Sequence, residues 1–79
     1  MNLSQLSPFT PAVIDEVESV SGNDPIAKRL RELGFVNGEP VRIVARGPLG
    51  ADPLLVQIGF TRFALRRAEA QRVRIHLAD

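Results

Sequence analysis

The side chains that could perform chemistry are one histidine and a group of acids near the amino terminus. His76 is the single histidine of the chain, and cysteine is absent. Asp15, Glu16 and Glu18 could approach His76 if the first and last strands pair, and such a mixture of nitrogen and oxygen ligands would hold a divalent transition ion weakly. These four residues are therefore the candidate ligands of a weak Fe²⁺ or Zn²⁺ site. No cofactor is expected to be required.

Enzymatic catalysis finds no support in the sequence. His76 falls on the polar side of the last expected strand, and the spacing places no serine or carboxylate beside it. The glycines between Gly47 and Gly50 resemble a phosphate cradle, but the lysine and the hydroxyl that a nucleotide loop places at the head of a helix are missing. We expect a protein that is not an enzyme and binds no nucleotide.

Basic residues gather in the second half of the chain. Residues 1–40 hold three bases and six acids, whereas residues 41–79 hold seven bases and three acids. Arginines on outward strand positions could contact nucleic acid phosphates. However, Trp and Tyr are absent and Phe35, Phe60 and Phe63 occupy expected core positions, which leaves no platform for bases. We expect no nucleic acid partner, and a solvated or protein-contacting surface made by Arg42, Arg46, Arg62, Arg66, Arg67, Arg72 and Arg74.

The stretch Asp24 to Gly38 predicts a short helix that ends in a turn. Asp24 is the expected N-cap, and Pro25 suits the first helical position because its missing N–H is not needed there. Gly34 can adopt the left-handed conformation that ends a helix. Asn37-Gly38 then reverses the chain into the next strand.

Alternating apolar and polar residues predict about five short strands. We expect them over residues 12–17, 39–46, 54–60, 62–66 and 72–77, with a loop over residues 47–53 and a single helical turn over residues 67–71. Strands this short cannot leave two long edges open in a soluble domain. The predicted fold is therefore mainly β with a helical insertion, a small barrel plugged by one helix.

Length and composition indicate one domain over residues 1–79, with room for a single core. A chain without cysteine requires no oxidising compartment. No apolar run approaches the ~18 to 20 residues that span a bilayer, and the amino terminus lacks the features of a signal peptide. We expect a cytoplasmic protein without membrane insertion.

Two leucines fall outside the predicted core. Leu49 lies at the tip of the expected loop, and Leu55 lies on the outer face of a strand. Single exposed leucines are common, but together with the helix these two could line a cleft for a partner, with arginines at the rim. The predicted partner-binding residues are Leu49, Leu55, Arg29, Arg31, Pro48 and Asp52.

The chain contains three motifs, Ile26-x-x-Arg29-Leu30-x-x-Leu33-Gly34-Phe35-x-x-Gly38, Pro48-Leu49-Gly50-x-Asp52-Pro53 and Ala64-Leu65-Arg66-Arg67-x-Glu69-Ala70. In this order and spacing they resemble the ferrous iron transport protein A (FeoA) family. The resemblance covers nearly the whole chain and implies a cytosolic SH3-like barrel with a helical insertion. It departs from the family pattern at Asn37-Gly38, where Pro-Gly is frequent, and at Thr10-Pro11, where a glycine is frequent.

The resemblance implies a partner, the membrane ferrous-iron permease FeoB, which carries its own GTPase domain. On this interpretation the chain is an adaptor that docks on the cytosolic region of FeoB and modulates iron uptake. The alternative is a metal-binding or metal-sensing regulatory module, because the same barrel resembles the carboxy-terminal domain of iron-dependent repressors, although no DNA-reading domain is present here. The sequence leaves open whether the permease is activated, inhibited or assembled, and whether the chain self-associates.

Overall fold

The computed structural model describes residues 1–49 and 52–79, with Leu49 described by its backbone alone. Five antiparallel strands form one sheet in the order β4-β3-β2-β1-β5, so the predicted class, mainly β with a helical insertion, is confirmed. The strands are β1 (Ala12–Val17), β2 (Pro40–Leu49), β3 (Asp52–Ile58), β4 (Thr61–Leu65) and β5 (Val73–Leu77), and the helices are α1 (Pro25–Glu32), α2 (Arg67–Ala70) and a 3-10 turn at Leu3–Gln5.

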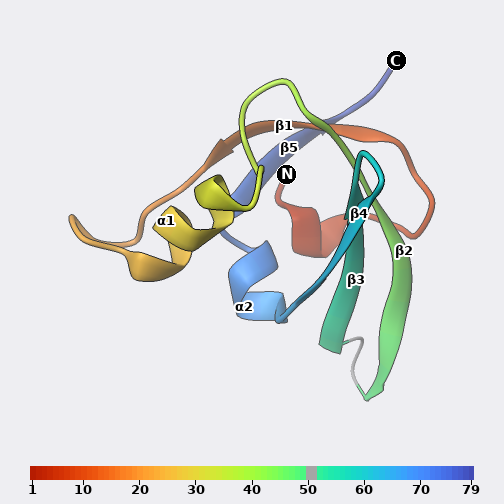
Figure 1. Ribbon diagram of the computed structural model, residues 1–79. Helices are drawn as coiled ribbons and strands as arrows, with labels where there is room; N and C mark the ends of the chain where they lie inside the picture. The colour runs from red at the N-terminus through yellow and green to blue at the C-terminus, as the bar shows by residue number, and fades with distance from the viewer. Residues whose placement is uncertain (50–51) are drawn as a thin grey trace.

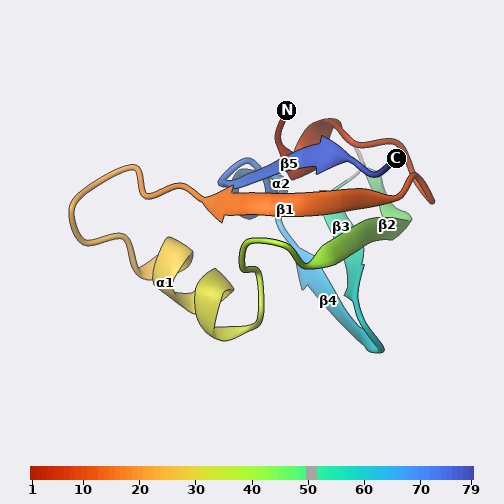
Figure 2. The ribbon, with the colours of Figure 1, turned by 90° about the horizontal axis from the view of Figure 1, so that it is seen from above.

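The sheet folds over on itself between β1 and β2. These two strands pair only at Ala12 with Val41 and at Val13 with Pro40, whereas β1 pairs with β5 along its length. The β1–β5 pair therefore runs across the layer of β2, β3 and β4, with α1 and α2 beside the open side (Figures 1 and 2). The space between the layers is filled by buried side chains that include Ile14, Leu30, Phe35, Ile43, Leu54, Val56, Val73 and Ile75.

The amino-terminal segment covers the outer edge of β5. The N–H of Ile75 donates to the carbonyl of Met1 at 2.9 Å, and Asn2 forms a β-bridge with Arg74. An edge strand exposes unpaired backbone groups unless something covers it. The start of the chain provides that cover for β5.

Local signals at both ends of α1 place the helix where the sequence predicts it. The Asp24 carboxylate accepts hydrogen bonds from the N–H groups of Ile26 at 3.0 Å and Ala27 at 3.3 Å. At the other end Gly34 has a φ of +111°. The N–H of Phe35 donates to the carbonyl of Leu30 at 3.1 Å. This is the Schellman arrangement, so the helix ends because glycine tolerates the left-handed conformation there.

A bulge explains the irregular alternation of β1. The pairing with β5 shifts between Ile14 and Glu16, which leaves Asp15 as an extra residue. Ile14 and Val17 can therefore both face the core although they are three residues apart. The Asn37 side chain fixes the bulge by donating to the Asp15 carbonyl at 2.9 Å.

The predicted loop over residues 47–53 is wrong. β2 continues to Leu49 and β3 begins at Asp52, and these two residues pair across the hairpin. The register shifts between Arg46 and Leu49, so the glycine and prolines that suggested a loop belong to a bulged hairpin. The part of the predicted loop at Gly50 and Ala51 lies outside the described residues.

The predicted core position of Phe60 is also wrong. β3 ends at Ile58, which pairs with Thr61, so Gly59 and Phe60 form the two-residue turn between β3 and β4. Gly59 has a φ of +58°, and the Phe60 side chain is fully exposed. Phe35 and Phe63 do pack together, with ring centroids 5.6 Å apart. The alternation of apolar and polar residues continues past the end of β3, so by itself it predicts that Phe60 faces the core.

Candidate functional site

Two hollows meet beside the β2–β3 hairpin and share Pro53 and Ala64. The first has a volume of about 390 Å³ and lies where α1, α2 and β4 approach the hairpin. The second, of about 220 Å³, is mostly apolar and lies over the hairpin itself. We call the combined surface the hairpin face, and its lining residues are Arg29, Ala45, Arg46, Gly47, Asp52, Pro53, Leu54, Leu55, Ala64, Arg66 and Glu69.

Hydrogen bonds at the start of α2 hold the polar part of the hairpin face in place. Asp52 Oδ1 accepts from the N–H of Arg67 at 3.1 Å, which joins the hairpin to α2. Glu69 Oε1 accepts from the N–H of Arg66 at 2.8 Å. The other oxygen of Glu69, Oε2, lies 3.7 Å from Arg29 Nη1, and the Arg29 side chain is 71% exposed. An ion pair with so exposed an arginine contributes little to the stability of the fold. Arg29 is therefore available to contact a carboxylate of a partner protein.

The hairpin face contains three of the six residues predicted to bind a partner. Arg29, Asp52 and Leu55 line its hollows. Pro48 is exposed and directly follows the lining residue Gly47. The side chain of Leu49 lies outside what the structure describes.

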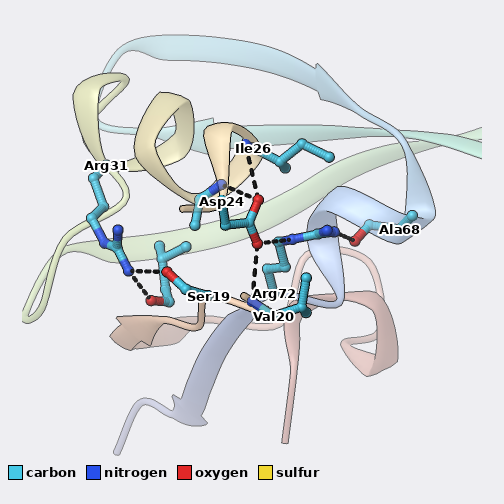
Figure 3. A network of polar contacts seen from close by, with 9 residues as sticks. Ser19, Val20, Asp24, Ile26, Arg31, Ala68 and Arg72 are labelled. Carbon is cyan, nitrogen blue, oxygen red and sulfur yellow. Dashed lines mark hydrogen bonds and ion pairs between the residues drawn. The ribbon is translucent and has the colours of Figure 1, made fainter. Parts of the chain in front are cut away.

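Arg31 does not share this surface. Its Nη2 donates to the carbonyl of Val17 at 2.7 Å and lies 3.2 Å from the hydroxyl of Ser19, as Figure 3 shows. These contacts tie α1 to the end of β1. The guanidinium of Arg31 therefore has a structural role on another side of the molecule, beside a hollow lined in part by Asp15 and Asn37.

The prediction of a solvated arginine is wrong for Arg72. Its Nε lies 2.9 Å from Asp24 Oδ2, and the two side chains are only 16% and 3% exposed. Arg72 Nη1 also donates to the carbonyl of Ala68 at 2.9 Å (Figure 3). Arg46 departs from the prediction as well, because its Nη2 donates to the carbonyl of Leu6 at 2.5 Å. Both arginines join segments far apart in the sequence, which no local spacing indicates.

The Asp24 carboxylate is held in its charged form. Its Oδ2 accepts from the N–H of Val20 at 3.0 Å as well as from Arg72. The hydrogen bond from Val20, followed by that from Arg72, holds the pKa of Asp24 well below its usual range. This carboxylate therefore stabilises the fold and is not a general acid.

The candidate metal ligands come together only in part. His76 Nδ1 lies 2.5 Å from Asp15 Oδ1, because β1 and β5 pair as the metal hypothesis required. Glu18 instead pairs with Arg74, whose Nε is 3.0 Å from Glu18 Oε1. Within residues 1–49 and 52–79, no group of three or more histidine, aspartate or glutamate side chains could hold a metal ion. One imidazole and one carboxylate are fewer than the usual four ligands of a zinc site.

A five-stranded sheet folded into a small barrel with an inserted helix defines an SH3-like fold. The chain belongs to the FeoA domain family, whose model matches residues 1–77. A fusion of Fe(2+) transport protein A and the Fe(2+) transporter FeoB from Porphyromonas gingivalis (strain ATCC BAA-308 / W83) is 36% identical over 77 residues. That match covers 98% of this chain and 9% of the fusion protein.

Solved structures support the same fold. The FeoA of Stenotrophomonas maltophilia, solved in complex with zinc and described as a procaryotic SH3 domain protein, is 60% identical, with a TM-score of 0.89 over 96% of this chain and 89% of that chain. A manganese-dependent transcriptional repressor also superposes, with a TM-score of 0.80 over 99% of this chain and 41% of that chain. At 13% identity, the repressor shows only that the fold is shared. Among the described residues, no helix is long and apolar enough to cross a membrane.

Proposed function

We propose that this chain is a cytoplasmic accessory protein of bacterial ferrous iron uptake, without enzymatic activity, that docks on the cytosolic GTPase region of a FeoB-like permease and modulates uptake. The observation that carries the proposal is the Porphyromonas gingivalis relative, in which a FeoA part and the FeoB transporter belong to one chain. Fusion keeps two modules at a high effective concentration. A separate FeoA chain must reach the same partner through a surface of its own.

The hairpin face is the docking surface in this proposal. Its apolar hollow, with Leu55 and Ala64 in the wall, can receive a hydrophobic side chain of the partner. Arg29 and Arg66 line the adjacent polar hollow and can meet carboxylates at the rim.

Binding of the purified chain to the isolated cytosolic domain of FeoB tests the proposal. We expect Leu55→Asp to weaken binding by roughly tenfold or more, because a carboxylate in the apolar hollow opposes burial of the partner's side chain. Leu77→Asp is the matched control, since Leu77 is half exposed on β5 and lies outside the hairpin face. Circular dichroism checks that both variants fold. Unchanged affinity of a folded Leu55→Asp variant would remove the hairpin face from the proposal.

Transition-metal binding is the second candidate function. It is favoured by the contact between His76 and Asp15 and by the zinc complex of the Stenotrophomonas maltophilia relative. Titration of the chain with Zn²⁺ or Fe²⁺ tests it, with His76→Ala as the variant. Saturable binding tighter than about micromolar that depends on His76 would favour a metal-sensing module over the adaptor. Weak binding is what two ligands predict, and it would leave the adaptor as the better account.

A further inference from the structure

Another hollow crosses the sheet at the other end of β2 and β3. It has a volume of about 410 Å³, and most of its lining is apolar. It shares no lining residue with the hairpin face. We call it the cross-strand groove, and it is lined by Pro11, Ala12, Val13, Pro40, Val41, Arg42, Gln57, Gly59 and Ala78.

Two exposed phenylalanines lie next to the cross-strand groove. Phe60 directly follows the lining residue Gly59 and is fully exposed at the β3–β4 turn. Phe9 is 64% exposed, and its N–H donates to the carbonyl of Ile43, one residue beyond the lining residue Arg42. Aromatic side chains beside an apolar hollow are typical anchors of protein interfaces.

The backbone of Phe9 adopts a conformation that does not favour phenylalanine. Its φ is +63°, and within the described residues it is the one position other than glycine with a positive φ. The N–H of Thr10 donates to the carbonyl of Ser7 at 3.3 Å, so a turn holds the backbone of Phe9 in this region. Packing in the core does not account for a phenylalanine here, because the side chain is largely exposed.

The end of the cross-strand groove nearest Phe60 is basic. Arg42 lies opposite Gln57, and Gln57 lies opposite Arg62 on β4, so three polar residues form a row across β2, β3 and β4. Both arginines are exposed, and in the described part of the chain neither forms an ion pair. Gln57 Nε2 donates to the carbonyl of Gly59 at 2.9 Å, whereas Gln57 Oε1 is buried without a hydrogen-bond partner among the described residues.

We propose that the cross-strand groove is a second docking site and that it takes an acidic segment of a partner protein that also carries apolar side chains. The apolar side chains of the segment pack into the groove against Phe60 and Phe9. Its carboxylates lie over Arg42 and Arg62, which form no ion pair with another described residue. This site lies beyond the hairpin face, so the module has two docking surfaces.

Titration of the isotope-labelled chain with short synthetic peptides, followed by amide NMR, tests the proposal. The probe is an acetylated peptide in which leucine alternates with glutamate, and the control peptide has lysine in place of each glutamate. We expect the glutamate peptide to shift the amide signals of Arg42, Gln57 and Phe60 while those of Leu55 and Ala64 stay in place. The lysine peptide should bind about tenfold more weakly, or not at all.

Variants identify the residues that bind. Phe60→Ser should lower the affinity for the glutamate peptide by about tenfold, and it should fold because the side chain is fully exposed. Exchanging both arginines, Arg42→Glu with Arg62→Glu, should reverse the preference so that the lysine peptide binds better. Arg67→Glu is the matched control for charge, because Arg67 lies outside the groove, and it should leave the preference for glutamate in place.

Three results would overturn the proposal. Equal affinity for both peptides would mean that the groove binds apolar side chains and does not distinguish acidic from basic peptides. Shifts at Leu55 and Ala64 in place of the groove residues would assign the peptide to the hairpin face. Sedimentation of the chain with phosphatidylglycerol vesicles, without any response to the peptides, would make Phe60 and the arginines a membrane contact.

Discussion

Single residues in this fold serve two elements at once, and Asp24 is the clearest case. One carboxylate oxygen caps α1, as the local sequence predicts. The other oxygen binds the N–H of Val20 and the guanidinium of Arg72. The cap could be predicted because its partners lie within three residues. The contact with Arg72 could not, because 48 residues separate the pair and only the folded chain brings the residue before β5 to the start of α1.

Acid should weaken the fold through Asp24. The folded state lowers the pKa of this carboxylate, so below about pH 4, the ordinary value of aspartate, the unfolded chain binds a proton that the folded chain does not. Stability is therefore present above that pH and falls as the pH drops toward the lowered pKa of the folded state. Asp24→Asn should lower the urea midpoint at about pH 7 and reduce its further fall at about pH 3. Asp79→Asn, at the exposed end of the chain, should change neither value.

At position 9, glycine should give a more stable fold than alanine, which is the reverse of the usual order. At most positions alanine is the more stabilising of the two, but at a φ of +63° a Cβ atom is unfavourable. We expect Phe9→Gly to be more stable than Phe9→Ala by about 1 kcal/mol in urea unfolding. The same pair of substitutions at Val20, which is exposed without a positive φ, should favour alanine or show no difference. If alanine were also better at position 9, the strain assigned to Phe9 would be absent in solution.

At the scale of elements, the features that sequence predicts are those with local causes. α1 could be predicted because its cap, its proline and its terminal glycine all lie within a dozen residues. The sequence predicts a loop over residues 47–53, where β2 and β3 in fact continue, because a bulge is defined by the partner strand, which the sequence of one strand does not contain. Alternation predicts an inward Phe60 because it does not indicate where a strand stops.

The two candidate surfaces also differ in how far the local sequence predicts them. Leu55 is an apolar residue at an outward position of its own strand, so the sequence indicates part of the hairpin face. The cross-strand groove combines residues of β1, β2, β3 and the carboxy-terminal end, none of which is unusual in its own segment. Only the pairing of Val13 with Pro40 and of Arg42 with Gln57 assembles it.

Close contact between the strands of the hairpin makes Gly47 sensitive to substitution. A Cβ atom at Gly47 would lie 2.5 Å from the carbonyl oxygen of Asp52, and backbone cannot move aside cheaply. Gly47→Ala should therefore lower the free energy of unfolding by about 1 to 3 kcal/mol. Gly22→Ala is the control, because nothing lies within 4 Å of a Cβ there, and it should be neutral or slightly stabilising. Equal stability of both variants would mean that the hairpin opens at Gly47 in solution.

At the scale of the whole molecule, the two proposed docking surfaces lie at opposite ends of one pair of strands. The hairpin face includes Ala45 and Leu55, whereas the cross-strand groove includes Arg42 and Gln57 from the same two strands. In Figure 1 the hairpin points away from the β1–β5 layer, and the β3–β4 turn lies at the opposite end of β3. A small barrel arranged in this way can hold two segments at the same time, whether they belong to one partner or to two.

Separate surfaces on a rigid sheet predict independent binding. No lining residue is shared, and β2 and β3 are joined by ladder pairs between the two sites, so neither ligand has an obvious element whose state it could change. The affinity for the FeoB cytosolic domain should therefore stay within about twofold when the glutamate peptide saturates the groove. Titration calorimetry with and without the peptide measures this. A change beyond about fivefold, with the same change in peptide affinity that linkage requires, would mean that the surfaces overlap or that the barrel has a second state.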